Sequence, residues 1–354
     1  MRTLVLALGL LVAALPAAAQ NRLHLYIWSD YIAPDVIAAF ESECGCQVVQ
    51  SHYADNEEML AKLAAGAKGY DLIVPSTEVL GGMIKQNMLQ PLDKSRLPNL
   101  ANIEIGFLDN PADPDGRYSV PYAYTVTLIG YNTRKVEELG IDPHSWSVIF
   151  DPAVLQKIKG RVTVLDSPRE LLAAALIYLG HPANSLDPAH WKEAAEVIRQ
   201  AKPYWAAFNA ASYMRQLAAG SIWVAHAYSS DIFQAREEVR QAGRGFDIGF
   251  ALPREGALVG MDNLVIHRDA PRPDLAHQFI NFVLDGRQSA QLTNLIGAGN
   301  PNRAARPYIR PDILEISAIF PDAETLRRLQ VPEELPSARE RRALSRWWTE
   351  VKAR

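Results

Sequence analysis

The stretch "LHLYIWSDYIAPDVIAAFESECG", residues 23–45, decides the fold class of this chain. Its first six residues form an apolar and aromatic run, which predicts a buried strand. Pro34 suits the first turn of a helix that ends near Gly45. Val36 and Phe40 share one face of that helix. The pattern is a strand that passes directly into a helix.

The same strand–helix form recurs along the chain, which predicts β–α–β units and a parallel sheet with helices on both faces. Asp55 or Asn56 caps the second helix, which ends near Gly66. The stretches that carry the pattern are "CQVVQSHYA" (46–54), "YDLIVP" (70–75), "GRVTVLDSPRELLAAALIYLG" (160–180), "SIWVAHAYSSDIFQAREEV" (221–239) and "ALVGMDNLVIH" (257–267).

Length and composition set the broad class. The 354 residues suggest two domains of ordinary size, and 48% hydrophobic with 21% charged residues indicate a soluble globular chain. The net charge is −4 and the 36 Lys and Arg residues are spread along the chain, so a nucleic-acid partner is not expected. A mildly acidic surface suits a cationic ligand.

The first residues predict export. Arg2 precedes an apolar stretch, 4–15, and small residues at 17–19 offer a cleavage site, as in a secretory signal peptide over residues 1–19. The apolar stretch is too short to span a membrane, and no other stretch approaches the required length. We expect an exported, soluble chain without a lipid anchor, because no cysteine stands at the cleavage site.

The only cysteines are Cys44 and Cys46. An oxidising compartment would allow them to pair, although a bridge across one glycine is short. Neither a further cysteine nor a histidine lies nearby to complete a metal site. A disulfide and two free thiols both remain open.

In a sheet of this type, ligands lie beyond the carboxyl ends of the strands. Aromatic, hydroxyl and acidic residues fall at such ends, on loops far apart in the sequence. Carboxylates can meet an ammonium ion that has left water, while aromatic faces add cation–π attraction and cover methylenes. The pattern favours a cation-binding site. The candidates are Trp28, Ser29, Asp30, Tyr31, Ser76, Glu170, Tyr228, Asp231 and Asp262.

Each candidate also has a purely structural interpretation. The aromatic residues fit a hydrophobic core, and Asp30 and Ser76 fit helix caps. Glu170 and Asp231 fall in first helical turns, where an acid complements the helix dipole. Asp262 has the weakest structural explanation, because it interrupts an otherwise apolar strand.

The sequence holds no pattern typical of an enzyme. It lacks the G-x-S-x-G elbow, the H-E-x-x-H zinc motif and the G-x-x-x-x-G-K-[ST] phosphate loop. The eight histidines show no metal-ligand spacing. We therefore expect a binding protein that uses no cofactor and no metal. An amine-acting enzyme is the less favoured alternative, since paired carboxylates can do acid–base chemistry.

The chain also carries a series of motifs in a fixed order: "WSDYIAPDV" (28–36), "YDLIVPS" (70–76), "QPLDKSRLPN" (90–99), "VPYAYTVTLIGYN" (120–132), "LDSPRELLAAAL" (165–176), "SSDIFQA" (229–235) and "PREGALVGMDNLVI" (253–266). Together they resemble the periplasmic polyamine-binding proteins of bacterial ABC importers, most of all the putrescine type. The resemblance covers nearly the whole mature chain.

The resemblance implies a two-lobed, flytrap-like α/β protein with a mixed, mostly parallel sheet in each lobe and crossings near 128–133 and 250–256. The implied lobes are 20–130 with 253–320, and 131–252 with 321–354. The implied function is capture of a polyamine (putrescine, spermidine or a related di- or triamine) in the periplasm by a monomer, and its delivery to an inner-membrane ABC permease. A polyamine sensor that signals through a membrane receptor would have the same site and remains an alternative.

The resemblance further implies two ammonium subsites and an aromatic floor. The residues are Asp262 and Asp231 for the first ammonium ion, Glu170 with Ser76 and Asp30 for the second, and Trp28 and Tyr31 for the floor, with Ser29 between them.

The aromatic residues depart from the family pattern. Tyr228 stands at the family's tryptophan, Gly260 at a usual aromatic and Ala298 at a usual tyrosine. Glu78 stands where the putrescine branch has a serine and the spermidine branch a tyrosine, so one more acid is expected to face the ligand. Because the missing rings open space, we expect a longer polyamine or a guanidino amine to bind at least as well as putrescine.

Overall fold

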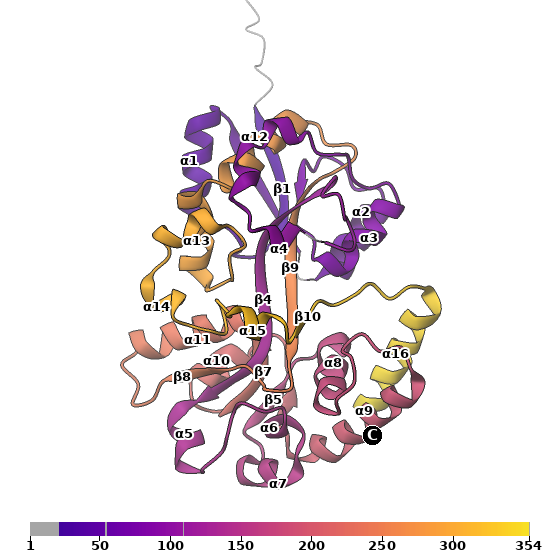
Figure 1. Cartoon of the computed structure of the whole chain (residues 1–354), viewed down its shortest axis with the longest axis vertical. Helices are drawn as coiled ribbons and strands as arrows, with labels where there is room; N and C mark the ends of the chain where they lie inside the picture. The colour runs from indigo at the N-terminus through magenta and orange to yellow at the C-terminus, as the bar shows by residue number, and fades with distance from the viewer. Residues whose placement is uncertain (1–20, 54, 109, 354) are drawn as a thin grey trace, which may run out of the picture.

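Two long strands, β4 (Ser119–Asn132) and β9 (Ala257–Ile266), run through the middle of the molecule and join its two lobes (Figure 1). The structure, a computed structural model, describes residues 21–53, 55–108 and 110–353. The predicted signal peptide over residues 1–19 lies outside them. β4 pairs with β9 up to Val126 and with β7 from Thr127 onward, so the chain passes between the lobes within one strand.

The strands of the described residues form one ten-stranded mixed sheet in the order β2-β1-β3-β9-β4-β7-β5-β6, with β8 on β4 and β10 on β9. β1 is parallel to β2 and β3, and β5 is parallel to β6 and β7, whereas β4 and β9 are antiparallel to their neighbours in the main order. The remaining bounds are β1 (Arg22–Trp28), β2 (Gln47–Tyr53), β3 (Leu72–Ile73), β5 (Val162–Val164), β6 (Ala207–Phe208), β7 (Val224–Tyr228), β8 (Ile248–Ala251) and β10 (Leu329–Gln330).

Helices cover both faces of the sheet in each lobe (Figure 1). In the upper lobe they are α1 (Pro34–Cys44), α2 (Asn56–Ala64), α3 (Thr77–Lys85), α4 (Ile105–Leu108), α12 (Pro273–Val283) and α13 (Gly286–Ile296). In the lower lobe they are α5 (Thr133–Glu138), α6 (Ser147–Phe150), α7 (Pro152–Leu155), α8 (Pro168–Tyr178), α9 (Pro188–Ala201), α10 (Tyr213–Ala218), α11 (Ser229–Gln241) and α16 (Ala338–Ala353). The short helices α14 (Pro311–Leu314) and α15 (Ala323–Leu326) lie near the waist of the molecule.

The local signals near the N-terminus are confirmed. α1 begins at Pro34 and ends at Gly45, whose φ of 57° is a left-handed conformation that glycine adopts at little cost. The Asp55 carboxylate caps α2 by accepting from the backbone N–H of Glu58 at 2.7 Å. Cys44 and Cys46 form a disulfide, which decides between the two open alternatives.

The buried side chains form separate clusters above and below the waist. Leu25 and Phe279 belong to a cluster of the upper lobe, and Trp146 belongs to one of the lower lobe. Ile313, which precedes the predicted boundary at residue 320, shares a cluster with Phe233 of α11. Because this cluster includes residues assigned to both lobes, the lobe boundaries at 130, 252 and 320 stay a prediction. Among the described residues, no helix has the length and apolar character that a membrane span requires.

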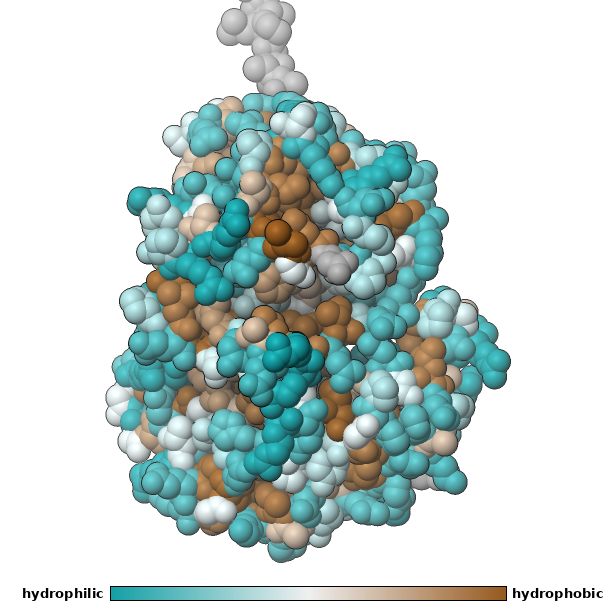
Figure 2. All heavy atoms as spheres, viewed as in Figure 1, coloured by the Kyte–Doolittle hydropathy of each residue, from teal (hydrophilic) through white to brown (hydrophobic). Residues whose placement is uncertain are grey.

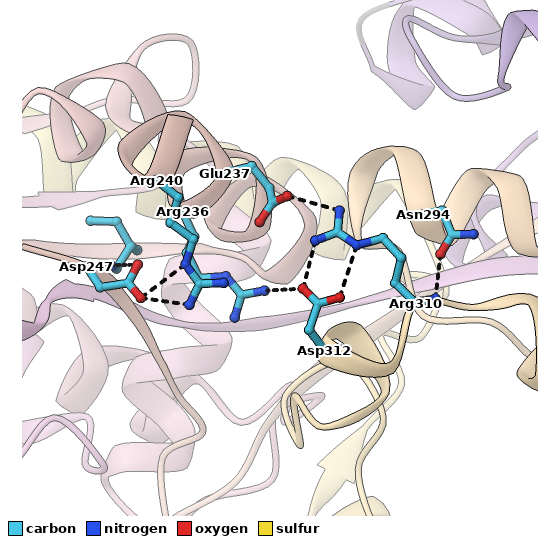
Figure 3. A network of polar contacts seen from close by, with 8 residues as sticks. Arg236, Glu237, Arg240, Asp247, Asn294, Arg310 and Asp312 are labelled. Carbon is cyan, nitrogen blue, oxygen red and sulfur yellow. Dashed lines mark hydrogen bonds and ion pairs between the residues drawn. The ribbon is translucent and has the colours of Figure 1, made fainter. Parts of the chain in front are cut away.

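A network of ion pairs joins α11 to the segment that carries α14 (Figure 3). Arg310 Nη1 lies 3.0 Å from Glu237 Oε2, and Arg310 donates to both oxygens of Asp312 at 3.0 and 2.7 Å. Arg240 Nη2 lies 2.7 Å from Asp247 Oδ2. We call these five residues the arginine network, in which each carboxylate faces a guanidinium group.

Candidate ligand-binding site

Asp262, the acid within β9, lies at the centre of the candidate site and is only 9% exposed. Its carboxylate accepts from the Tyr31 hydroxyl at 2.6 Å and from Ser76 Oγ at 2.7 Å. Burial raises the pKa of Asp262 to about 6, although both hydrogen bonds lower it. The side chain is thus held in place by hydroxyl groups that leave its charge uncompensated.

Ser76 is the N-cap residue of α3, but its side chain does not cap the helix. Its hydroxyl is donated to Asp262 instead, and a backbone bridge between Ser76 and Asp262 brings the two together. The interpretation of Ser76 as a simple cap is therefore wrong. The structure also groups Ser76 with Asp262, whereas we expected it beside Glu170.

Glu170 lies in the first turn of α8, in the other lobe. Its carboxylate accepts from Thr127 Oγ1 at 2.7 Å, and Thr127 belongs to β4 at the point where that strand passes between the lobes. Burial raises the pKa of Glu170 to about 7; the Thr127 hydrogen bond opposes this shift and the charge of Glu78 adds to it. Its protonation therefore changes near neutral pH.

Asp231 lies in the first turn of α11 and accepts a hydrogen bond from the hydroxyl of Tyr213. Burial raises the pKa of Asp231, while the Tyr213 hydrogen bond lowers it. The Tyr213 oxygen in turn accepts from the backbone N–H of Tyr228 at 3.4 Å. Asp231 is thus a third partly desolvated acid whose donor is a hydroxyl.

The phenol of Tyr228, at the end of β7, is influenced by the charges of these acids. Burial raises the pKa of its phenol well above the ordinary value, and negative charges from both lobes raise it further. We call the carboxylates responsible the acidic site: Glu170, Glu78, Asp231 and Asp262. Tyr228 lies opposite Thr127, the donor to Glu170, and directly precedes α11, which carries Asp231, so that acids from both lobes act on one phenol.

Aromatic rings line this cluster. The Trp28 ring meets Tyr53 edge to face, with 4.7 Å between centroids, and Tyr31 meets Tyr122 in the same way at 6.1 Å. Trp28 is partly buried, and within the described residues its buried Nε1 has no hydrogen-bond partner. These rings can cover the methylenes of a bound cation.

Ser29 and Asp30 lie outside this cluster of contacts. Both residues are exposed, and Asp30 adopts a φ of 56°. The N-cap of α1 is Ala33, so the interpretation of Asp30 as a helix cap is wrong. The hydrogen bonds of Asp262 and Glu170 described above involve neither residue.

The other three departures from the family pattern, besides Tyr228, have different surroundings. Gly260 lies two residues before Asp262 on β9, so both face the same side, and a Cβ there would meet only Thr125 Oγ1, at 3.9 Å. Ala298 is fully buried, so its side chain has no solvent-exposed surface. Glu78 accepts from Asn56 Nδ2 at 3.1 Å.

Sequence reasoning missed the donors that hold the acids. Thr127 lies in the motif "VPYAYTVTLIGYN", where a threonine between Val126 and Leu128 in a buried strand was a usable signal. Tyr213 gave no signal, because its role depends on how α10 packs beside α11. Arg169, next to Glu170, is a cation beside an expected ligand-binding acid, and this adjacency was a usable signal.

Two α/β lobes joined by strands that cross between them, with polar side chains from both lobes around one cluster, define a solute-binding protein. The chain belongs to the bacterial extracellular solute-binding protein family, whose sequence pattern matches residues 35–313. Membership in this family confirms the resemblance found in the sequence.

Individual proteins are similar over nearly the full length. The chain is 55% identical over 354 residues to a putrescine/cadaverine-binding protein of Pseudomonas aeruginosa, covering 100% of both chains. It is 36% identical over 346 residues to the putrescine-binding periplasmic protein PotF of Escherichia coli, covering 95% of this chain and 93% of PotF. The structure of the spermidine/putrescine ABC transporter substrate-binding protein PotD from Streptococcus pneumoniae is similar with a TM-score of 0.84 at 27% identity, covering 94% of this chain and 99% of that one. This likeness confirms the predicted fold class.

Proposed function

We propose that this protein binds a polyamine between its lobes in the periplasm and delivers it to an ABC permease. The observation that carries the proposal is the acidic site, in which Asp262, Asp231 and Glu170 accept hydrogen bonds from hydroxyl groups. Removing carboxylates from water without a cation is costly, so a ligand with several positive charges is the natural partner.

The resemblance to the polyamine-binding family favours a division of labour between the acids. Asp262 and Asp231 meet one ammonium ion and Glu170 meets another, while the rings of Trp28 and Tyr31 lie along the methylenes between them. Since the acids come from both lobes, only a closed arrangement places all of them around the ligand. Ligand binding therefore stabilises the closed form.

Periplasmic location and delivery to a permease rest on other observations. The signal-like residues 1–19 favour export, and the family is one of extracellular solute-binding proteins. Relatives at 55% and 36% identity are named for putrescine and cadaverine or for putrescine, which favours an amine as cargo.

The test is thermal unfolding of the mature chain with putrescine, cadaverine, spermidine and agmatine, with leucine and maltose as neutral controls. At a ligand concentration a hundredfold above Kd, the free energy of unfolding should rise by roughly 2.7 kcal/mol. The amine should be recovered chemically unchanged, as a binding protein requires. A melting curve that no di- or triamine shifts at millimolar concentration would refute the proposal, and turnover of the amine would favour an enzyme.

A further inference from the structure

A cation of the protein itself, Arg169, is the chain neighbour of Glu170 in the acidic site. Arg169, adjacent to Glu170 in the first turn of α8, donates from its guanidinium group to the Glu333 carbonyl oxygen at 2.9 Å and to Asn184 Oδ1 at 3.0 Å. Asn184 also accepts from the Glu333 N–H at 3.1 Å and donates to the Val331 carbonyl oxygen at 2.9 Å. The side chain of Arg169 is thus anchored by a defined set of bonds.

Residues 331–337, which we call the strap, run past the waist from β10 to α16 (Figure 1). The strap also contacts the other lobe, since Glu334 Oε2 lies 3.4 Å from Lys85 Nζ of α3. The Glu334 carboxylate lies so close to α3 that a Cβ on Gly81 or Gly82 would be 3.1 or 3.0 Å from its oxygens. The strap therefore brings Arg169 beside α3, whose first turn carries Glu78.

Glu78 is oriented for this approach by Asn56, which donates to Glu78 Oε1 and whose Oδ1 accepts from the Ser76 N–H. Burial raises the pKa of Glu78, and the charge of Arg169 is the strongest influence in the opposite direction. Burial lowers the pKa of Arg169, and the charges of Glu78 and Glu170 oppose this shift. Arg169 thus lies within electrostatic reach of one acid from each lobe.

We propose that Arg169, anchored by the strap that also contacts α3 of the other lobe, is a resident cation that closes one end of the binding site and makes the protein prefer diamines to triamines. The inference rests on the proposed polyamine function. A diamine uses Asp262, Asp231 and Glu170, whereas the third ammonium ion of a triamine lies against the guanidinium group. Repulsion of a competing ligand is a recognised source of specificity.

This arrangement gives Glu78 a different role from the one expected from the sequence. There Glu78 was an additional acid for a longer ligand. In the structure, its negative charge is opposed by Arg169 and its carboxylate is hydrogen-bonded to Asn56. The space left by Gly260 is at a different place from Glu78. It lies beside Thr125, on the face of β9 that carries Asp262.

The experiment is calorimetry of the mature chain with putrescine, cadaverine and spermidine. Wild type should bind both diamines more tightly than spermidine. Arg169→Met, which removes the charge and keeps an apolar side chain, should shift the spermidine-to-putrescine affinity ratio toward spermidine by about tenfold or more. Arg169→Lys should restore the wild-type preference, and Glu78→Gln should disfavour spermidine further.

Arg254→Met is the matched control, because Arg254 forms an ion pair with Asp142 elsewhere in the lower lobe. It should leave the ratio unchanged. A wild type that prefers spermidine, or an Arg169→Met variant that alters all affinities equally, would overturn this inference while leaving the proposed function intact. If Arg169→Met does not fold, an unchanged ratio in Glu78→Gln would overturn it. A wild type that binds no polyamine would overturn both proposals.

Discussion

Carboxylates meet different partners in two regions of this molecule. In the arginine network, shown in Figure 3, every carboxylate faces a guanidinium group at 2.7 to 3.0 Å. In the acidic site, the donors to Asp262, Asp231 and Glu170 are hydroxyl groups. Arg310 lowers the pKa of Asp312, whereas burial raises the pKa of Asp262 to about 6.

The difference distinguishes structural acids from acids that await a ligand. An ion pair within the protein satisfies both charges and needs nothing further. A hydroxyl group orients a carboxylate but leaves its charge in place, and a partly desolvated charge gains most from an added cation. On the face shown in Figure 2, hydrophilic residues are spread over both lobes between hydrophobic patches; charges exposed there are hydrated, and this argument does not apply to them.

The largest expected effect comes from neutralising one acid in each region. Asp262→Asn should weaken polyamine binding by roughly 2–5 kcal/mol, because the ligand's ammonium ion would lose one of its two counter-ions in the site. Asp312→Asn should leave the affinity unchanged, since Asp312 belongs to the arginine network. Calorimetry with putrescine compares the two variants directly.

A second comparison uses Asp30→Asn, because asparagine tolerates the positive φ of that position. Asp30 is exposed, so its charge is screened by water and its loss should cost far less than that of Asp262. Equal small losses in Asp262→Asn and Asp30→Asn would remove Asp262 from the binding site.

The second prediction concerns pH, with an effect of roughly a hundredfold on affinity. An acid must be ionised to meet an ammonium ion, and the pKa values of Glu170 and Asp262 are about 7 and about 6. Once the pH falls below the pKa of an acid, protonation of that acid weakens polyamine binding by up to about tenfold per pH unit. Lowering the pH from 7.5 to 5.5 should therefore weaken binding through both acids. Binding near pH 6.5 should release protons, which calorimetry in buffers of different ionisation enthalpy detects.

The unliganded protein should respond to pH in the opposite direction. The pKa of Glu170 is higher in the folded chain than its ordinary value of 4.5, so its contribution to stability is present below pH 4.5 and is lost as the pH rises through 7. The difference in unfolding free energy between wild type and Glu170→Gln isolates this contribution from that of His226, whose pKa burial lowers to about 3. A difference that does not change between pH 4.5 and 7 would contradict the raised pKa.

Much of the fold could be predicted because its signals are local. The turn from β1 into α1, the left-handed Gly45 and the cap at Asp55 each depend on a few neighbouring residues. Asp262 could be identified because an acid in an apolar strand requires an explanation. Each of these features can be recognised from residues that are neighbours in the sequence.

The grouping of the site residues could not be predicted, because it depends on contacts between distant segments. Ser76 joins Asp262 through a backbone bridge across 186 residues, and the Tyr213 hydroxyl reaches Asp231 only after α10 packs on α11. The role of Arg169 depends on the strap, which approaches it from residues 331–337. Contacts of this kind follow from tertiary packing.

The third prediction adds a ring to each region. Gly260→Phe should place an aromatic face beside Asp262, where a Cβ has room, and should strengthen diamine binding by about 0.5–2 kcal/mol through cation–π attraction. Gly245→Phe, in an exposed turn near Asp247, is the matched control and should have no effect on binding. Weaker binding in Gly260→Phe would mean that the ligand itself occupies this space.

The smallest effect should follow from breaking the arginine network. Arg310→Met removes the guanidinium group that Glu237 and Asp312 share, but Asp312 is partly exposed and Arg236 Nη2 lies 4.0 Å from it. Water and this second arginine can take over, so the unfolding free energy should fall by no more than about 1 kcal/mol, and by less at high salt. Polyamine affinity should not change, because each charge lost or exposed lies outside the acidic site. Chemical denaturation at low and high salt, together with calorimetry, measures both quantities; a change in affinity would show that the arginine network is coupled to closure of the lobes and that the two regions are not independent.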